Sequence, residues 1–134
     1  MVMKNSLLEF TELLKNRLTD LLFEESGNDK YIHLYLADGY WTAFEKSAYR
    51  LYHIYEPVML LPMMLPAIPF PIVTASIKQD GLYAAIRGLT CRKWSRHERI
   101  YADEGNISII AYQEWHDRVT DGLRSLSRKA FIYE

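Results

Sequence analysis

The densest group of chemically useful side chains in this sequence lies between residues 87 and 101. Five basic residues share the stretch with two large aromatic side chains, a histidine and one carboxylate: Arg87, Arg92, Lys93, Arg96, Arg99, Trp94, Tyr101, His97 and Glu98. Guanidinium and ammonium groups neutralise phosphates, and aromatic rings stack on unpaired bases. The mixture therefore predicts a nucleic-acid contact that consists of Arg92, Lys93, Trp94, Arg96 and Arg99. The alternative is a solvated connection whose aromatic side chains fold back onto the core.

A second candidate contact is the aromatic pair Tyr40 and Trp41, which the spacing of apolar residues places at the start of a helix. An aromatic ring in that position can stack on a base. It can also close the edge of a core and keep its polar tip in water. Both interpretations stay open, and Tyr40 and Trp41 join the predicted nucleic-acid contacts.

The stretch from residue 57 to residue 71 is apolar and rich in methionine and proline. No charge occurs between Val58 and Leu65. Methionine adapts to irregular surfaces, and proline interrupts regular structure, so the stretch is a candidate interface with a second copy or another protein. Its predicted contact residues are Met59, Met63, Met64 and Leu65. Packing beneath the sheet is the alternative.

Catalytic and metal-binding patterns are missing from the sequence. No two of the four histidines are placed to share a helix face, and Glu114, His116 and Asp117 are expected on the surface. Cys91 could be a reactive thiol beside basic residues, although a lone cysteine is more often a small buried residue. We therefore expect a protein without catalytic activity, cofactor or metal; an enzyme assembled from distant residues is the weakest alternative.

Length and composition favour one globular domain that spans residues 1–134. Hydrophobic residues make up 49% of the chain and charged residues 25%, as in ordinary globular proteins. Sixteen basic and seventeen acidic residues give a net charge of −1, so any attraction to nucleic acid must be local. Prolines break the longest uncharged stretch, and the N-terminus lacks the features of a signal peptide. These features predict a cytoplasmic protein that does not contact membranes.

The periodicity of apolar residues predicts an α+β fold, in which helices pack on one mixed or antiparallel sheet. Helices are expected to begin near Ser6, where Glu9 completes a capping box, near Trp41 and near Glu114. Strands are expected at Lys30 to Ala37, Ile72 to Ile77, Leu82 to Leu89 and Asn106 to Ala111, with a possible last edge strand at Phe131 to Tyr133. Asp80-Gly81 is expected to form a tight hairpin turn between the second and third strands.

Two blocks of the sequence resemble the N-terminal mismatch-recognition domain of the DNA-repair ATPase MutS. The first runs from Tyr31 to Ala48 and reads YIHLYLADGYWTAFEKSA. The second is GNISIIAY, from Gly105 to Tyr112, followed by Trp115 and Leu123. The resemblance implies a similar fold and binding of DNA without ATP hydrolysis.

In the MutS family a phenylalanine stacks on the mispaired base and a glutamate contacts it. The matching positions here are Tyr40 and Thr42. Tyr40 keeps an aromatic ring, whereas Thr42 lacks the carboxylate, so the resemblance implies little preference for mismatched over paired duplex.

The preferred hypothesis from the sequence is a non-enzymatic module that binds single-stranded DNA or distorted duplex. The alternative is a protein-interaction or homodimerisation module that uses residues 57–71 and has lost DNA binding. The two differ in whether the basic residues and Tyr40 share one surface.

Overall fold

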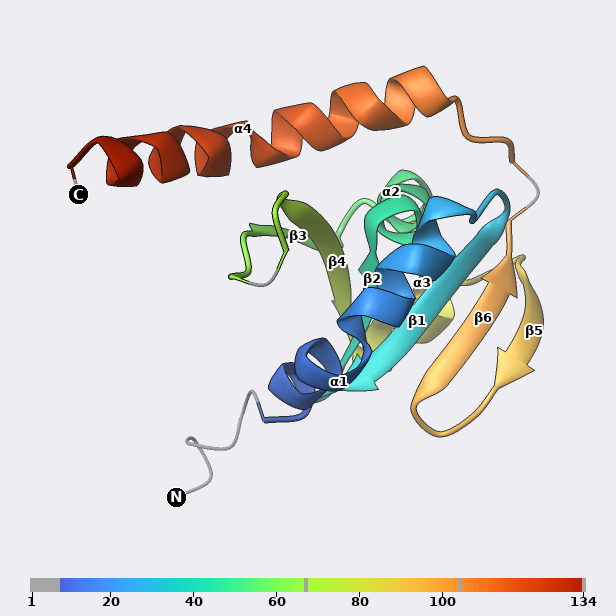
Figure 1. The fold of residues 1–134 in the computed structure, drawn as a ribbon. Coiled ribbons are helices and arrows are strands. Elements are labelled where there is room, and N and C mark those ends of the chain that lie inside the picture. Colours follow the sequence, from blue (N-terminus) through green and yellow to red (C-terminus); the bar gives the residue numbers. More distant parts are fainter. Residues whose placement is uncertain (1–7, 67, 104, 134) are drawn as a thin grey trace.

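The computed structural model describes residues 8–66, 68–103 and 105–133, with side chains up to residue 123. Its centre is one six-stranded antiparallel sheet with the order β3-β4-β2-β1-β6-β5 (Figure 1). Helices pack on both faces of this sheet, so the predicted α+β class is confirmed. The long helix α4, Ile109–Tyr133, crosses the upper end of the molecule in Figure 1.

The centre of the sheet is a hairpin of β1, Tyr31–Ala37, and β2, Tyr40–Phe44. Asp38 and Gly39 join the two strands with φ angles of 54° and 82°. A type I′ turn needs positive φ at both central residues, which explains the Asp-Gly sequence. The strand predicted at residues 30–37 is confirmed as an interior strand.

The helix predicted from Trp41 begins later, because Trp41 belongs to β2. The helix α2 runs over Glu45–Ile54. Trp41 and Phe44 have helical spacing with Ala48, but β2 pairs with β1 on one side and with β4, Ile72–Lys78, on the other. Pairing on both sides of a strand outweighs a short helical pattern.

The hairpin predicted at Asp80-Gly81 is wrong. Gly81 has a φ of −91°, and the chain continues from the 3-10 turn η2, Gln79–Gly81, into the short helix α3, Leu82–Ala85. The next strands are β5, Thr90–Trp94, and β6, Glu98–Ala102. Sequence patterning missed them because they form a charged edge hairpin in which apolar and polar residues do not alternate regularly.

The strand predicted at Asn106 to Ala111 is also wrong, because α4 begins at Ile109. Ser108 acts as the N-cap: its hydroxyl accepts a hydrogen bond of 3.2 Å from the backbone N–H of Ala111. This cap starts the helix five residues before the predicted position near Glu114. The last residues, Phe131 to Tyr133, continue α4 and form no edge strand.

The two faces of the sheet carry separate hydrophobic cores. The first core contains Ile32, Leu34, Trp41, Val73 and Ala75 from the strands, and Ala48, Leu51, Leu82, Ala85 and Trp115 from α2, α3 and α4. The second core joins Tyr35, Phe44 and Ile72 to Leu18 and Leu21 of α1, Leu8–Ser26. The predicted packing of amphipathic helices on the sheet is therefore confirmed.

The start of α1 is fixed by a residue of the β1–β2 turn. The Asp38 carboxylate accepts hydrogen bonds from the backbone N–H groups of Glu9 and Phe10, and Glu9 in turn accepts one of 2.8 Å from the Asp38 N–H. This arrangement resembles a capping box made across the fold. The predicted cap Ser6 lies outside the described residues.

The Met/Pro-rich stretch forms the edge strand β3, Met59–Met63, and the connection to β4. Met59 and Leu61 are each 53% exposed, and Met64 is 39% exposed. Met63 and Leu65 instead pack against the second core. Of the four predicted interface residues, Met59 and Met64 are thus exposed, whereas Met63 and Leu65 are partly buried.

Candidate nucleic-acid interface

Arg99 on β6 is the residue of the predicted basic block that contacts two tryptophan rings. Its guanidinium carbon lies 4.8 Å from the ring centre of Trp41 and 4.4 Å from that of Trp94. The Nε atom of Arg99 also donates a hydrogen bond of 3.3 Å to the Ser95 carbonyl. Cation–π contacts with two rings and the hydrogen bond from Nε restrict the orientation of the guanidinium.

The two tryptophans differ in their exposure to solvent. Trp41 is 2% exposed and belongs to the first core, whereas Trp94 is 68% exposed at the end of β5. Trp94 faces Arg99 across the hairpin as its strand partner. Arg99 therefore connects a buried ring to a ring that is available for stacking.

Hydrogen bonds fix the tip of the β5–β6 hairpin. The Ser95 N–H donates to the Glu98 carbonyl at 2.9 Å, and the Ser95 hydroxyl accepts from the Glu98 N–H at 3.1 Å. The His97 carbonyl accepts a bond of 2.9 Å from the backbone N–H of Leu36 at the end of β1. The basic residues of this hairpin are thus held at a defined place beside the centre of the sheet.

A pocket of about 600 Å³ lies beside this hairpin. The residues that line it come from the start of α1, the β1–β2 hairpin, η2 and the β5–β6 hairpin: Glu9, Leu36, Gly39, Trp41, Gln79, Trp94, Arg96, His97 and Arg99. The lining contains two guanidinium groups and one carboxylate, that of Glu9, which accepts the Asp38 N–H. The pocket can therefore attract an anion and offer it a flat aromatic surface.

Lys93, a further predicted contact, already has a carboxylate partner. Its Nζ lies 3.2 Å from Glu98, and Arg17 of α1 lies 2.8 Å from the other oxygen of the same carboxylate. Partial burial raises the pKa of Glu98, but the hydrogen bonds and charges of Arg17 and Lys93 outweigh this effect, so the pKa lies below its ordinary value. Glu98 therefore remains ionised and offsets the charge of Lys93.

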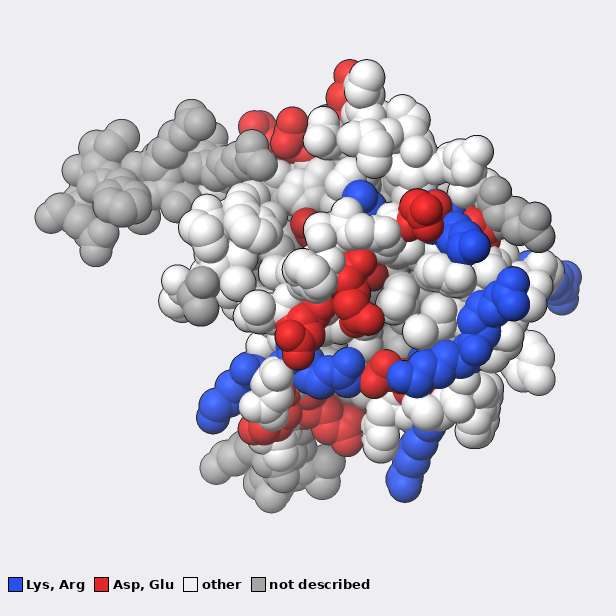
Figure 2. Space-filling view, turned by 45° about the vertical axis from the view of Figure 1, so that its right-hand side comes forward, with Lys and Arg blue, Asp and Glu red and all other residues white. Residues whose placement is uncertain are grey.

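Basic side chains extend beyond the pocket along the same side of the molecule. Figure 2 shows Lys and Arg in a broken line across this side, with acidic residues between some of them. Arg92 is exposed on β5 at the bulge in the β5–β6 pairing. Both Arg92 and Arg96 are therefore accessible to a phosphate chain.

The structure does not bring Tyr40 to this pocket. Tyr40 and Trp41 are adjacent in β2, so their side chains point to opposite faces of the sheet. Tyr40 lines a different pocket of about 230 Å³, which Tyr55 and Met59 also line. Trp41, rather than Tyr40, is the aromatic residue that meets the basic block.

The position that matches the MutS glutamate lies in the interior. Thr42 is 2% exposed, and its hydroxyl lies 2.9 Å from that of Ser76 on β4. The first resembling block forms a strand, a turn, a second strand and a helix, and the second block contains the start of α4 and no strand. Tyr40 and Thr42 therefore do not form a shared base-contact site.

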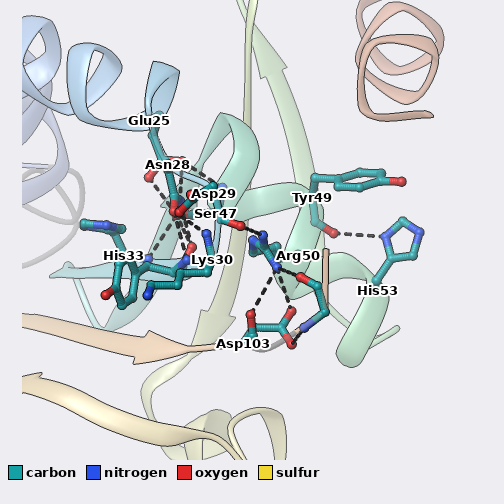
Figure 3. Close-up of polar contacts among 12 residues, drawn as sticks. Glu25, Asn28, Asp29, Lys30, His33, Ser47, Tyr49, Arg50, His53 and Asp103 are labelled. Atoms are coloured by element: carbon teal, nitrogen blue, oxygen red, sulfur yellow. Dashed lines mark hydrogen bonds and ion pairs between the residues drawn. The ribbon is translucent and has the colours of Figure 1, made fainter. Parts of the chain in front are cut away.

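A buried polar cluster that sequence patterning did not predict lies at the junction of α1, α2 and β1 (Figure 3). Glu25 is 3% exposed and accepts hydrogen bonds from the Ser47 N–H at 2.8 Å, the Ser47 hydroxyl at 2.6 Å and the Asn28 amide at 3.2 Å. Burial raises the pKa of Glu25 to about 7, although these hydrogen bonds act in the opposite direction. The carboxyl group can therefore change its charge near neutral pH.

Arg50 forms a second buried contact in the same region (Figure 3). Its guanidinium lies 3.2 Å from the Asp103 carboxylate and donates to the backbone carbonyls of Asp29 and Gly105. These bonds attach α2 to the connection that precedes β1 and to the connection that follows β6. Arg50 thus has a structural role. It comes well before the predicted basic block in the sequence.

His116, expected on the surface, is instead half-buried. Its Nε2 lies 2.9 Å from Glu45, the first residue of α2, which also accepts the Val73 N–H at 2.8 Å. Within residues 8–66, 68–103 and 105–133, no three His, Cys, Asp or Glu side chains gather as metal ligands. Cys91 is exposed on β5.

Comparisons with protein-family models, with curated proteins and with solved structures gave no match. In the part of the chain that the structure describes, none of the helices has the length and apolar character needed to cross a membrane.

Proposed function

We propose that this domain is a non-enzymatic module that binds single-stranded DNA or distorted duplex at its β5–β6 hairpin. The observation that carries the proposal is the Arg99 guanidinium held between Trp41 and Trp94 at a pocket that Arg96 also lines. Proteins that bind single strands combine these two features: basic groups for the phosphates and aromatic faces for the bases.

The residues have different roles in this proposal. Exposed Trp94 stacks on a base, and Arg99 and Arg96 contact the adjacent phosphate. Arg92 contacts a further phosphate along the strand. Trp41 acts through Arg99, because a residue in the first core cannot reach a base itself.

The proposed ligand is unpaired or distorted rather than a regular duplex. Bases in a regular duplex stack on each other, so they do not offer their faces to Trp94. Thr42 is buried, and Tyr40 lies at a different pocket, so these two positions do not form a pair that detects a mismatch. We therefore expect little difference between mismatched and perfectly paired duplex.

The exposed side chains of β3 favour a second candidate function, self-association. Met59 and Leu61 are half-exposed neighbours on one face of an edge strand. Backbone pairing along this edge is hindered, because Pro62, the fourth of the five residues of β3, lacks an N–H group. A second copy would therefore be held by the side chains of Met59 and Leu61 rather than by an extended sheet.

Titration of labelled DNA at low salt tests the proposal. A single strand, a perfect duplex and a duplex with one mismatch are compared by fluorescence anisotropy. The expected order is tightest binding to the single strand and equal, weaker binding to the two duplexes. No binding to any of them at micromolar protein would overturn the proposal and favour the self-association function.

A further inference from the structure

The charges around the β5–β6 pocket differ between its two sides. Arg96 lines the pocket from the hairpin side, where Arg92 also lies on β5, whereas a neighbouring hollow on the α1 side shares Glu9, Leu36 and His97 with the pocket. That hollow is also lined by Glu12 and by Arg17. Glu98 pairs with both Arg17 and Lys93 and offsets Arg17 only in part, but the two carboxylates of Glu9 and Glu12 outweigh the positive charge that remains on this side.

A nucleic-acid strand that enters over the hairpin therefore meets attraction first and repulsion afterwards. Glu12 and Glu9 repel a continuing phosphate chain on the far side of His97. A strand that ends inside the pocket avoids this repulsion. The charge distribution thus favours a strand end over an internal segment.

The donors in the pocket also suit a terminal phosphate. Among the described residues, the terminal nitrogens of Arg99 have no hydrogen-bond partner, and Arg96 has none either. A terminal phosphate carries about −1.5 to −2 charges at neutral pH, against one for an internal phosphodiester. The guanidinium of Arg96 and the terminal nitrogens of Arg99 match the larger charge and the additional oxygens.

We infer that the pocket lined by Trp94, Arg96 and Arg99 takes the terminal phosphate of a nucleic-acid strand, with the terminal base stacked on Trp94. This inference rests on the proposed function and names the part of the strand that the site recognises. Arg99 contacts the phosphate from a fixed position, and Arg96 closes over it from the hairpin tip.

The test compares forms of one internally labelled single strand: with a 5′-phosphate, with a 3′-phosphate, with hydroxyl groups at both ends, and closed into a circle. One phosphorylated form should bind about tenfold tighter than the hydroxyl form, because the extra charge adds charge-assisted hydrogen bonds. The circle should bind no tighter than the hydroxyl form.

Two arginine variants separate the pocket from the rest of the hairpin. Arg96→Gln should abolish the preference for the phosphorylated strand, since Arg96 lines the pocket. Arg92→Gln should weaken every form alike, because Arg92 does not line it. Glu12→Gln should improve binding of the circle by removing the repulsion on the α1 side.

The outcomes distinguish this inference from the proposed function. Equal affinity for the phosphorylated and hydroxyl strands, with clear binding of both, would overturn the terminal-phosphate inference and leave the proposed function intact. Retention of the phosphate preference in Arg96→Gln would overturn the assignment of the pocket. No binding of any strand would overturn both.

Discussion

The carboxylate of Glu25, near the end of α1, accepts a hydrogen bond of 2.8 Å from the backbone N–H of Ser47 in the first turn of α2. The N-cap residue of α2, Phe44, has no side chain that can make this bond. Glu25 therefore caps α2 from another helix and leaves its carboxylate in the interior. A cap of this kind makes the stability of the fold depend on pH.

We expect the wild-type free energy of unfolding to contain a Glu25 contribution that falls as pH rises. The folded pKa of about 7 lies above the ordinary value of 4.5, so this contribution is complete below pH 4.5 and is lost as pH rises to about 7. The loss is on the order of 3 kcal/mol. The glutamine in Glu25→Gln cannot ionise, so the variant should lack this fall in the free energy of unfolding between pH 4.5 and about 7.

Chemical denaturation of both proteins between pH 4.5 and 8 measures this effect. Burial lowers the pKa of His33, which changes stability in the opposite direction over part of this range. The difference between the variant and wild-type curves isolates Glu25, because His33 is present in both. A pH-independent difference would show that Glu25 titrates normally in the folded protein.

The β1–β2 turn predicts a contrast between two glycines. Gly39 has a φ of +82°, which side chains rarely adopt, whereas Gly27 has no positive φ and open space around it. Gly39→Ala should lower the free energy of unfolding by about 1–2 kcal/mol. Gly27→Ala serves as the matched control and should change it little. Thermal unfolding of the two variants decides the point, and equal effects would contradict the turn assignment.

The division of the Met/Pro-rich stretch predicts different effects for two methionines. Met63→Asp places a carboxylate against the second core and should destabilise the fold by about 2 kcal/mol or more. Met59→Asp lies on the exposed side of β3 and should leave unfolding nearly unchanged. If β3 mediates self-association, Met59→Asp should also reduce the dimer fraction in analytical ultracentrifugation. A wild-type chain that is monomeric at high concentration would remove the self-association function.

Stacking on Trp94 predicts a loss of affinity that salt does not alter. Trp94→Ala should weaken single-strand binding by about 1–3 kcal/mol, with the same dependence on salt as the wild type. Tyr83 on α3 is the control, because it is 89% exposed but does not line the pocket. Fluorescence titration of Trp94→Ala and Tyr83→Ala compares the two rings. Equal losses would show that stacking is not localised at the hairpin.

The sequence predicted the fold class and two interior strands, β1 and β4, but it missed the interior strands β2 and β6. Alternation of apolar residues identified β1, and the strand predicted at Ile72 to Ile77 coincides with β4. The hairpin of β5 and β6 escaped prediction because all five residues of β5 are exposed. Edge strands obtain their structure from a neighbouring strand, and one sequence does not reveal that neighbour.

Two Asp-Gly pairs illustrate the same limit. Asp38-Gly39 forms a hairpin turn, whereas Asp80-Gly81 lies in η2. The dipeptides are identical, and only the flanking strands decide whether positive φ is needed. At the candidate site, the sequence identified the basic block but paired it with Tyr40. The alternation of side chains along β2 brings Trp41 to that pocket instead. This placement could not be predicted from a sequence pattern that indicated a helix beginning near Trp41.

The salt dependence of single-strand binding tests the central claim most directly. Affinity falls as salt rises, and each phosphate contact makes the slope of log affinity against log salt steeper. For a single strand the change is about 0.7 per contact. Arg96→Gln should reduce the slope by about that amount, while Arg118→Gln, an exposed arginine of α4 that does not line the pocket, should leave it unchanged. Binding with a wild-type slope in Arg96→Gln, or with equal reductions in both variants, would contradict a phosphate contact at the β5–β6 hairpin.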